Sequence, residues 1–379
     1  MVRKTIAEIN RYEGTTVNPM HSPDEIFELY SVPSFDTNYP EIIAGADIGS
    51  SKVTVQENDV LICKINPRIN RVWVVKHHTA HPLLASSEWI VVRSPDMDAD
   101  YLRWYFSSPT FRVMLNSEVA GIGGSLTRAQ PKRVVQYPVP VCSIEEQRHI
   151  SAVLNRMESL ISLRKQQIAK LDELVKARFV EMFGNQNYSY HDLISLISDG
   201  AGLSYGIVQP GDDGTGDMGV LRPVDIIDGH IVTESIKYID RTIGEGFRKT
   251  ELTGDELLIT VRGTTGITAL TDGRFAGMNV TRGIAVIRFD RTKINPNYLN
   301  AYLQCDESQS YIQEHTRGAT LKQINLSDLR VQPILVPPRS IQDQFAVFVA
   351  QTDQQKLTIQ QSLAKLELLK KALMQKYFG

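Results

Sequence analysis

A stretch near the middle of the chain returns in altered form at its end, and this internal duplication limits the possible folds most. Within residues 138–184 and 335–379, the run Ser143, Ile144, Gln147 matches Ser340, Ile341, Gln344 at an offset of 197. Further along, Leu171, Lys176, Ala177, Phe183 and Gly184 match Leu366, Lys371, Ala372, Phe378 and Gly379 at an offset of 195, which predicts a second copy two residues shorter. This period is too long for a solenoid unit. The chain therefore holds two similar modules, each a globular segment followed by a helical run.

Each copy of the repeat predicts one long helix. Ser143 with Glu146, and Ser340 with Asp343, have the spacing of a capping box, and prolines stand just before both. Apolar residues then recur every three or four positions, without proline or glycine, until a terminal glycine in each copy. A helix of about 40 residues is about 60 Å long, more than a domain of about 150 residues is wide. We expect the two helices to pack on each other, antiparallel, as a coiled coil.

The residues expected in the coil interface follow the heptad-like stripes. They are Ile150, Leu154, Met157, Ile161, Ile168, Leu171 and Val175 in the first helix, and Val349, Ile359, Leu363, Leu366 and Leu373 in the second. The blander interpretation is that each stripe lies on its own globular segment, but two such helices favour pairing. We predict globular domains at 1–142 and 185–339, and spacer helices at 143–184 and 340–379.

The two globular segments resemble each other more weakly. The run Asp59-Val60-Leu61-Ile62 aligns with Asp255-Glu256-Leu257-Leu258 at an offset of 196, and both predict a turn that leads into a buried strand. Amphipathic helices are predicted at 101–115 and 298–314. Because strands and helices are scattered without βαβ alternation, we predict two α+β domains separated by the antiparallel helix pair, with a pseudo-two-fold repeat.

Loops that combine glycine, hydroxyl groups and cations occur at matching places in both segments. Residues 50–143 carry 11 Lys and Arg against 7 Asp and Glu, although the whole chain has a formal net charge of -2. Such loops can approach phosphates through backbone N–H groups and present arginine to guanine. The alternative is that these loops are only surface turns with solvated charges, and for any single residue this interpretation is at least as good as a DNA contact. Candidate DNA contacts are Lys64, Arg68, Arg71, Lys76, Ser125, Thr127, Arg128 and Lys132, then Arg248, Lys249, Arg262, Thr264, Thr265, Arg317, Thr320 and Lys322.

Composition places the chain among soluble proteins of the cytoplasm. No apolar run approaches the ~20 residues that cross a bilayer, so no membrane partner is expected. Three scattered cysteines form no pair pattern, as in a reducing compartment.

The order of Pro-rich strand, Ser-Ile-x-x-Gln, a long helix containing ISLRKQQIAKLDELVKARFVEMFG, and a second such run resembles the specificity subunit of type I restriction-modification systems. Val141 and Cys142 replace prolines common in that family. The resemblance implies two target recognition domains, each reading half of a split double-stranded DNA target. It implies helices that set the gap between the halves and dock two methyltransferase (M) subunits, which restriction/translocase (R) subunits join. Recognition domains of this family diverge strongly, so the resemblance assigns no base contact here.

Motifs for catalysis are incomplete, so a non-enzymatic recognition subunit is expected. Asn295-Pro296-Asn297-Tyr298 lacks the second proline of an amino-methyltransferase motif, and no phosphate-binding loop is present. Pro95, Asp96 and Asp98 lack a lysine at nuclease spacing, and no cysteine or carboxylate completes a metal set with His77, His78 and His81. We expect no catalytic residue, metal or cofactor on this chain, with S-adenosylmethionine, ATP and Mg on the partner subunits. A coiled-coil scaffold that binds no nucleic acid is the alternative, and it leaves the paired loops unexplained.

Overall fold

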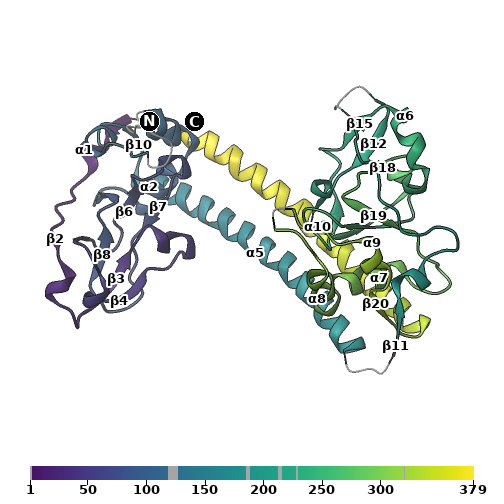
Figure 1. Cartoon of the computed structure of the whole chain (residues 1–379). Helices are drawn as coiled ribbons and strands as arrows, with labels where there is room; N and C mark the ends of the chain where they lie inside the picture. The colour runs from purple at the N-terminus through teal and green to yellow at the C-terminus, as the bar shows by residue number, and fades with distance from the viewer. Residues whose placement is uncertain (1, 118–126, 185–187, 212–215, 228, 320) are drawn as a thin grey trace. The chain divides into compact units, whose positions relative to one another are not determined.

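The chain divides into two compact units of mixed α and β structure. The computed structural model describes all residues except 1, 118–126, 185–187, 212–215, 228 and 320, so the candidates Ser125 and Thr320 lie outside the described residues. Unit 1 comprises Met1–Gln166 with Gln360–Gly379, and unit 2 comprises Gln167–Ile359 (Figure 1). The α+β content agrees with the class predicted from sequence. Each unit takes part of both long helices.

One three-stranded antiparallel sheet is common to the two units. Its order is β7-β6-β9 in unit 1 and β17-β16-β19 in unit 2. The strands are β6 (Val60–Cys63), β7 (Val72–Val74) and β9 (Trp89–Val92), and β16 (Leu257–Thr260), β17 (Thr268–Leu270) and β19 (Ile284–Ile287). Alternate residues of the central strand enter different cores: Val60 and Ile62 contact one, and Leu61 and Cys63 another. Because both faces are covered, β6 is apolar throughout and β16 is apolar from Leu257 to Ile259.

The other sheets differ between the units. Unit 1 has a five-stranded sheet, β2-β5-β8-β3-β4, and unit 2 has a three-stranded sheet, β15-β12-β18, and a hairpin, β13-β14. In unit 1 the strands are β2 (Thr16–Val17), β3 (Ile26–Tyr30), β4 (Glu41–Ala44), β5 (Lys52–Thr54) and β8 (Leu83–Ser86). In unit 2 they are β12 (Met218–Leu221), β13 (Ile226–Ile227), β14 (His230–Ile231), β15 (Lys237–Ile239) and β18 (Asn279–Val280). The shared framework therefore carries different additions.

Each predicted amphipathic helix is in fact two helices, so both predictions of a single helix were wrong. The segment 101–115 forms α2 (Ala99–Phe106) and α3 (Pro109–Ser117). The segment 298–314 forms α7 (Pro296–Gln304) and α8 (Asp306–Glu314). Pro109 has no N–H to continue α2 and restricts the residue before it. Cys305 has extended backbone angles, φ -71° and ψ 158°, which end α7.

Buried tyrosines tie α2 and α7 to the strands that precede the long helices. β10 (Pro138–Val141) pairs with β1 (Val2–Thr5), and β20 (Pro333–Val336) pairs with β11 (Ser189–Asp192), both antiparallel. The Tyr101 hydroxyl donates to the Pro140 carbonyl at 3.0 Å, and the Tyr298 hydroxyl donates to the Leu335 carbonyl at 2.8 Å. Burial raises the pKa of both tyrosines, which keeps the hydroxyls protonated as donors.

The long helices are α5 (Ile144–Phe183) and α10 (Arg339–Phe378), each of 40 residues. They begin 195 positions apart, at 144 and 339, as do the strands before them, at 138 and 333. The prediction that the second copy is two residues shorter was therefore wrong. The match at an offset of 197 is a coincidence of residue type. None of the helices in the described part of the chain is both long and apolar enough to span a membrane.

Of the two predicted capping boxes, the serine of the first caps its helix and the serine of the second does not. Ser143 Oγ accepts the Glu146 N–H at 3.2 Å, as predicted. Ser340 does not cap, because it is already the second residue of α10. Asp343 instead accepts hydrogen bonds from Arg339 Nε and Asn295 Nδ2, both at 2.7 Å. Pro338 stands at the position that corresponds to Ser143, so the second cap was a wrong prediction.

The true counterpart of Gln147 is Gln342, and both side chains are buried. Gln147 Oε1 accepts the Asp98 N–H at 3.0 Å, and its Nε2 donates to the Cys142 carbonyl at 2.9 Å. Gln342 repeats this with the Asn295 N–H and the Pro337 carbonyl, each at 2.8 Å. In each unit one glutamine thus joins the first turn of a long helix to the residue that caps α2 or α7.

Within each unit the two long helices run antiparallel. In unit 1, Glu158 of α5 lies 3.2 Å from Lys370 of α10, and Lys165 of α5 lies 3.4 Å from Glu367 of α10. The later residue of α5 therefore pairs with the earlier residue of α10. In unit 2, Asp172 of α5 lies 2.8 Å from Lys356 of α10. Lys356 interrupts the apolar stripe in the sequence, and this ion pair explains why a charge is tolerated there.

Helix burial depends on whether a globular part covers the helix. Of the predicted coil residues, Ile150, Leu154, Met157 and Ile161 are buried, whereas the remaining eight are half-buried: Ile168, Leu171, Val175, Val349, Ile359, Leu363, Leu366 and Leu373. The prediction omitted the aromatic ends. Phe179 and Phe183 join the core of unit 2 with Phe345, and Phe378 joins the core of unit 1. The interface extends into the globular cores, which a heptad stripe alone does not reveal.

We expect Gln342→Ala to destabilise unit 2 by about 1–3 kcal/mol, because the partly buried Asn295 N–H and the buried Pro337 carbonyl lose their partner. Gln344→Ala is the matched control, since Gln344 is exposed on the same helix, and its effect should stay within about 0.5 kcal/mol. Urea unfolding followed by circular dichroism measures both. Equal losses for the two variants would contradict the assignment of Gln342.

Candidate nucleic-acid interface

In unit 1 the predicted basic loop follows directly from β6. Its centre is a 3₁₀ turn, η4 (Pro67–Ile69), with Arg68 exposed at its tip. Asn66 and Asn70, on either side, have left-handed backbone angles, with φ of 47° and 51°. Asparagine adopts this conformation more readily than most residues. The sequence Asn-Pro-Arg-Ile-Asn therefore builds a fixed turn that displays one arginine.

This loop is hydrogen-bonded to a second predicted segment, 127–129. Asn66 N–H donates to the Thr127 carbonyl at 2.9 Å, and Ala129 N–H donates to the Lys64 carbonyl at 2.8 Å. Ile65 and Arg128 form an antiparallel bridge between these bonds. The structure thus places Lys64, and the start of the turn that carries Arg68, beside Thr127 and Arg128, although about 60 residues separate the two segments in sequence.

Unit 2 repeats the same arrangement. Gly263 N–H donates to the Lys322 carbonyl at 2.8 Å, Ile324 N–H donates to the Val261 carbonyl at 3.0 Å, and Arg262 bridges Gln323. Gly263 and Gly266 have φ of 83° and 89°, so glycine here supplies the left-handed turns that asparagine supplies in unit 1. We call these structures the paired loops: residues 64–71 with 127–129, and 262–266 with 322–324.

The other candidates divide by exposure. Lys132, Arg248, Lys249, Thr264, Arg317 and Lys322 are exposed. Arg71 is half-buried, 4.0 Å from Asp36. Thr265 is buried, and its hydroxyl lies 3.1 Å from the Thr316 hydroxyl. Thr265 therefore stabilises the loop itself, and this placement does not favour the predicted contact of Thr265 with DNA.

Four candidates lie elsewhere in the two units. Arg248 and Lys249 belong to η7 (Glu245–Thr250), which follows α6 (Arg241–Gly244). Lys76 Nζ donates to Asn58 Oδ1 at 3.0 Å and lines a separate cleft. Lys132 lies in α4 (Pro131–Val134), directly after the segment 127–129.

The strands that carry the paired loops are anchored by buried carboxylates. Asp59, before β6, receives two hydrogen bonds from Arg93 at 2.7 Å and one from the Gln56 N–H at 2.9 Å. Glu256, before β16, accepts the Thr253, Gly254 and Asp255 N–H groups at 2.7–3.0 Å. The counterpart of Asp59 is therefore Glu256, and the predicted alignment with Asp255 was one residue out of register. Burial raises the pKa of Glu256, but these bonds and those from the Thr253 and Thr271 hydroxyls outweigh burial and hold it below 4.5.

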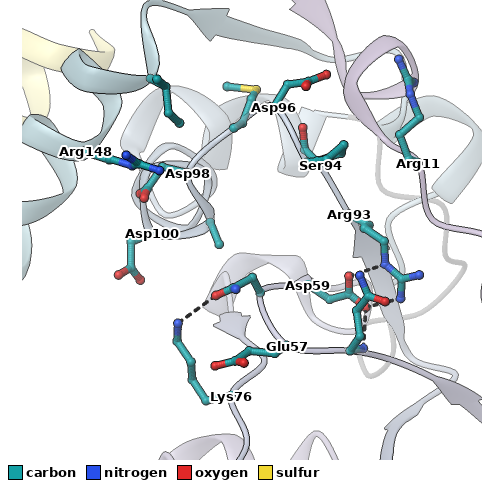
Figure 2. A pocket seen from close by; sticks show the side chains of 16 residues that line it. Arg11, Glu57, Asp59, Lys76, Arg93, Ser94, Asp96, Asp98, Asp100 and Arg148 are labelled. Carbon is teal, nitrogen blue, oxygen red and sulfur yellow. Dashed lines mark hydrogen bonds and ion pairs between the residues drawn. The ribbon is translucent and has the colours of Figure 1, made fainter.

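A cleft of about 740 Å³ in unit 1 contains the carboxylates that raised the question of a nuclease. Figure 2 shows Asp96, Asp98 and Asp100 on one side and the Asp59–Arg93 pair on the other. Asp98 caps α2 through the Tyr101 N–H at 2.8 Å, and Asp100 accepts from Asn155 at 2.9 Å. Among the described residues, no three His, Cys, Asp or Glu side chains are grouped to hold a metal ion. Asp59, Asp98 and Asp100 therefore have structural partners.

The histidine run is likewise engaged in local structure. The His78 ring lies 4.6 Å from the Tyr39 ring, and the His78 N–H donates to the buried Glu28 carboxylate at 3.2 Å. Thr79 also donates to Glu28. This carboxylate fixes the turn after Lys76.

Two acidic residues, one beside Arg128 of the paired loops and one beside Arg317, were not predicted from the sequence. Glu88 lies 3.1 Å from Arg128, and Asp328 lies 3.6 Å from Arg317. Neither stands in a motif, and 40 and 11 positions separate them from their arginines. Only the fold reveals these pairs.

Comparison with known proteins agrees with the resemblance found in the sequence. Residues 229–368 match the family model of the type I restriction modification DNA specificity domain. The specificity subunit of the type I restriction enzyme EcoBI from Escherichia coli is 25% identical over 199 residues. This match covers 51% of the chain and 41% of that protein's length.

Solved structures show the same fold over the whole chain. One similar solved structure comes from work titled "Structural basis underlying complex assembly and conformational transition of the type I R-M system". The two chains are 17% identical and superpose with a TM-score of 0.60, and the match covers 100% of this chain and 97% of the solved chain. The type I restriction-modification S subunit from M. genitalium has a TM-score of 0.56 at 11% identity, with coverage of 100% and 96%. At these identities the likeness concerns the fold alone.

We expect Glu256→Gln to destabilise unit 2 by about 1–3 kcal/mol at pH 7, because an amide presents N–H groups to backbone N–H donors. The pKa of Glu256 is lowered in the folded state, so its contribution is complete above pH 4.5 and is lost as the pH falls through the folded-state value. The stability gap between wild type and variant should narrow in acid. Urea unfolding from pH 7 to pH 3 measures the gap, with the exposed Glu245→Gln as control. A gap that is constant with pH would contradict this role.

Proposed function

Because the chain carries a type I restriction-modification DNA specificity domain over residues 229–368, we propose that it is the DNA-recognition subunit of such a system. The observation that supports this most is the repetition of the paired loops. Both units hold a cationic turn at the end of the shared sheet's central strand and fasten it to a second cationic segment by two backbone hydrogen bonds. Fixed loops of this kind can place arginine and lysine against phosphates and base edges with little loss of side-chain and backbone freedom.

The target is bipartite, with one half read by each unit. Two similar units suit a DNA site with two separate recognition halves, and α5 and α10 form the spacer that fixes the gap between them. Phosphate contacts place each unit on the duplex, and a few base contacts in the major groove give specificity. The differing second sheets allow the two half-sites to differ in sequence.

Catalysis belongs to partner subunits. Two methyltransferase subunits dock on the helical spacer with S-adenosylmethionine, and restriction/translocase subunits join with ATP and Mg. This chain contributes recognition and geometry. The carboxylates of the cleft in unit 1 support this division, because Asp59, Asp98 and Asp100 already bind groups of the same unit. A scaffold without nucleic-acid binding would explain α5 and α10 but would not require the same cationic turn in both units.

We expect Arg68→Ala and Arg262→Ala each to weaken duplex binding, by about 1–3 kcal/mol if the arginine reads a base. Footprinting of the chain with its methyltransferase partners should give two protected patches, and each variant should weaken one patch at matched salt. Arg3→Ala and Arg274→Ala are controls, because both arginines are exposed outside the paired loops. Wild-type affinity for both loop variants would remove these arginines from the interface, and no binding by any assembly would support the scaffold.

We expect paired removal of residues 165–171 and 357–363, one heptad from each long helix, to shorten the gap in the target. Seven helical residues span about 10.5 Å, which corresponds to about 3 base pairs. Removal from both helices preserves their antiparallel register, whereas removal from α5 alone should impair folding. Sequencing of modified adenines in cells that express the complex gives the gap directly. An unchanged gap in an active paired deletion would refute the spacer role.

A further inference from the structure

In unit 1 a partly buried carboxylate holds Arg128, one of the exposed arginines of the paired loops. Glu88, between β8 and β9, accepts a hydrogen bond from Arg128 Nη2 at 3.1 Å, and its other oxygen lies 4.0 Å from Lys64 Nζ. The Arg128 side chain is 54% exposed and that of Glu88 is 24% exposed. Glu88 Oε2 is buried and has no hydrogen-bond partner among the described residues. The carboxylate is therefore held beside two cations without being fully satisfied by them.

Unit 2 contains the same arrangement of charge from different positions. Arg317, with a side chain 72% exposed, lies 3.6 Å from Asp328, which is 20% exposed and belongs to α9 (Leu326–Arg330). Asp328 Oδ2 is also buried without a hydrogen-bond partner among the described residues. Glu88 precedes its arginine in the chain, whereas Asp328 follows its arginine. The two carboxylates therefore stand at positions of the two units that do not correspond.

Such pairs oppose DNA binding but do not prevent it. An arginine held by a carboxylate must leave it before it can contact a phosphate, and the carboxylate then lies near the phosphate charge. Pairs with one exposed partner are weak, so a phosphate can compete for the arginine. The free energy needed to break the ion pair is the same for every duplex, whereas the base contacts that offset it form only on the target.

We propose that Glu88 and Asp328 are competing counter-ions: each holds its loop arginine in the free protein and releases it to a DNA phosphate on binding. This inference rests on the proposed function and deepens it, because it assigns the two carboxylates a role in suppressing binding to non-target DNA. Their effect is sequence-independent, so it lowers occupancy of the many non-target sites that compete with the target.

The first test measures the affinity of the complex for a labelled duplex of random sequence at fixed salt. Glu88→Gln and Asp328→Asn should each tighten binding about two- to fivefold, the range expected when one weak ion pair no longer has to be broken. Gln and Asn preserve shape, so folding is maintained. Glu25→Gln and Glu234→Gln make the same change of charge at exposed glutamates and should have a smaller effect. Equal gains in all four variants would overturn the proposal.

The second test asks whether each carboxylate acts through its arginine. Glu88→Gln in an Arg128→Ala background, and Asp328→Asn in an Arg317→Ala background, should give no gain, because no arginine remains to be released. If the acid substitutions still tighten DNA binding in these backgrounds, the carboxylates act by simple repulsion of phosphates. If Glu88→Gln alone weakens DNA binding, the Glu88 carboxylate itself contacts DNA. Both results overturn the inference while the proposed function stands. Failure of the wild-type complex to bind any duplex overturns both.

Discussion

Each unit completes its core with the end of a long helix that begins outside that unit. Unit 1 buries Met374 and Phe378, from the end of α10, against Tyr101 and Tyr105 of α2. Unit 2 buries Phe179 and Phe183, from the end of α5, against Tyr298 and Phe345. A buried aromatic side chain contributes about 1.5–3 kcal/mol. Each unit therefore requires the last turns of the helix that begins in the other half of the sequence, and this exchange couples the folding of the two halves.

That exchange also fixes where the loops are presented. The glutamine in the first turn of each long helix binds the capping residue of α2 or α7, and the tyrosines of those helices bind the strand before the long helix. α2 and α7 in turn cover the core face of the shared sheet, whose central strand ends at the paired loops. The path from helix to loop consists of buried hydrogen bonds and close packing, which resist displacement. A spacer can set the position of a recognition loop only if such a path exists.

The sequence predicted the long helices, the α+β class and the loop segments, because periodicity and turn residues are local signals. It misplaced the equivalence of the two halves where chemistry differs at equivalent positions. Ser143 corresponds to Pro338, Asp59 to Glu256, and the left-handed asparagines of unit 1 to glycines in unit 2. A match of residue types does not reveal these equivalent positions, because different residues can fulfil the same backbone conformation or hydrogen-bonding role. The ion pairs of Glu88 and Asp328 could not be predicted either, because they depend on tertiary contacts between lone residues.

A near-neutral composition agrees with the proposed function, because a DNA-recognition subunit must reject most DNA. Uniform positive charge would strengthen binding to every duplex, since the phosphate contribution carries no sequence information. Here Arg93, Arg222 and Arg288 are held beside the buried carboxylates of Asp59, Asp225 and Glu256 and stabilise turns. Among the described residues, Arg128 in the paired loops and Arg317 beside them are exposed and paired with acids. Under the proposed function, discrimination depends on what the loops contact beyond phosphate, so the local arrangement of charge matters more than its total.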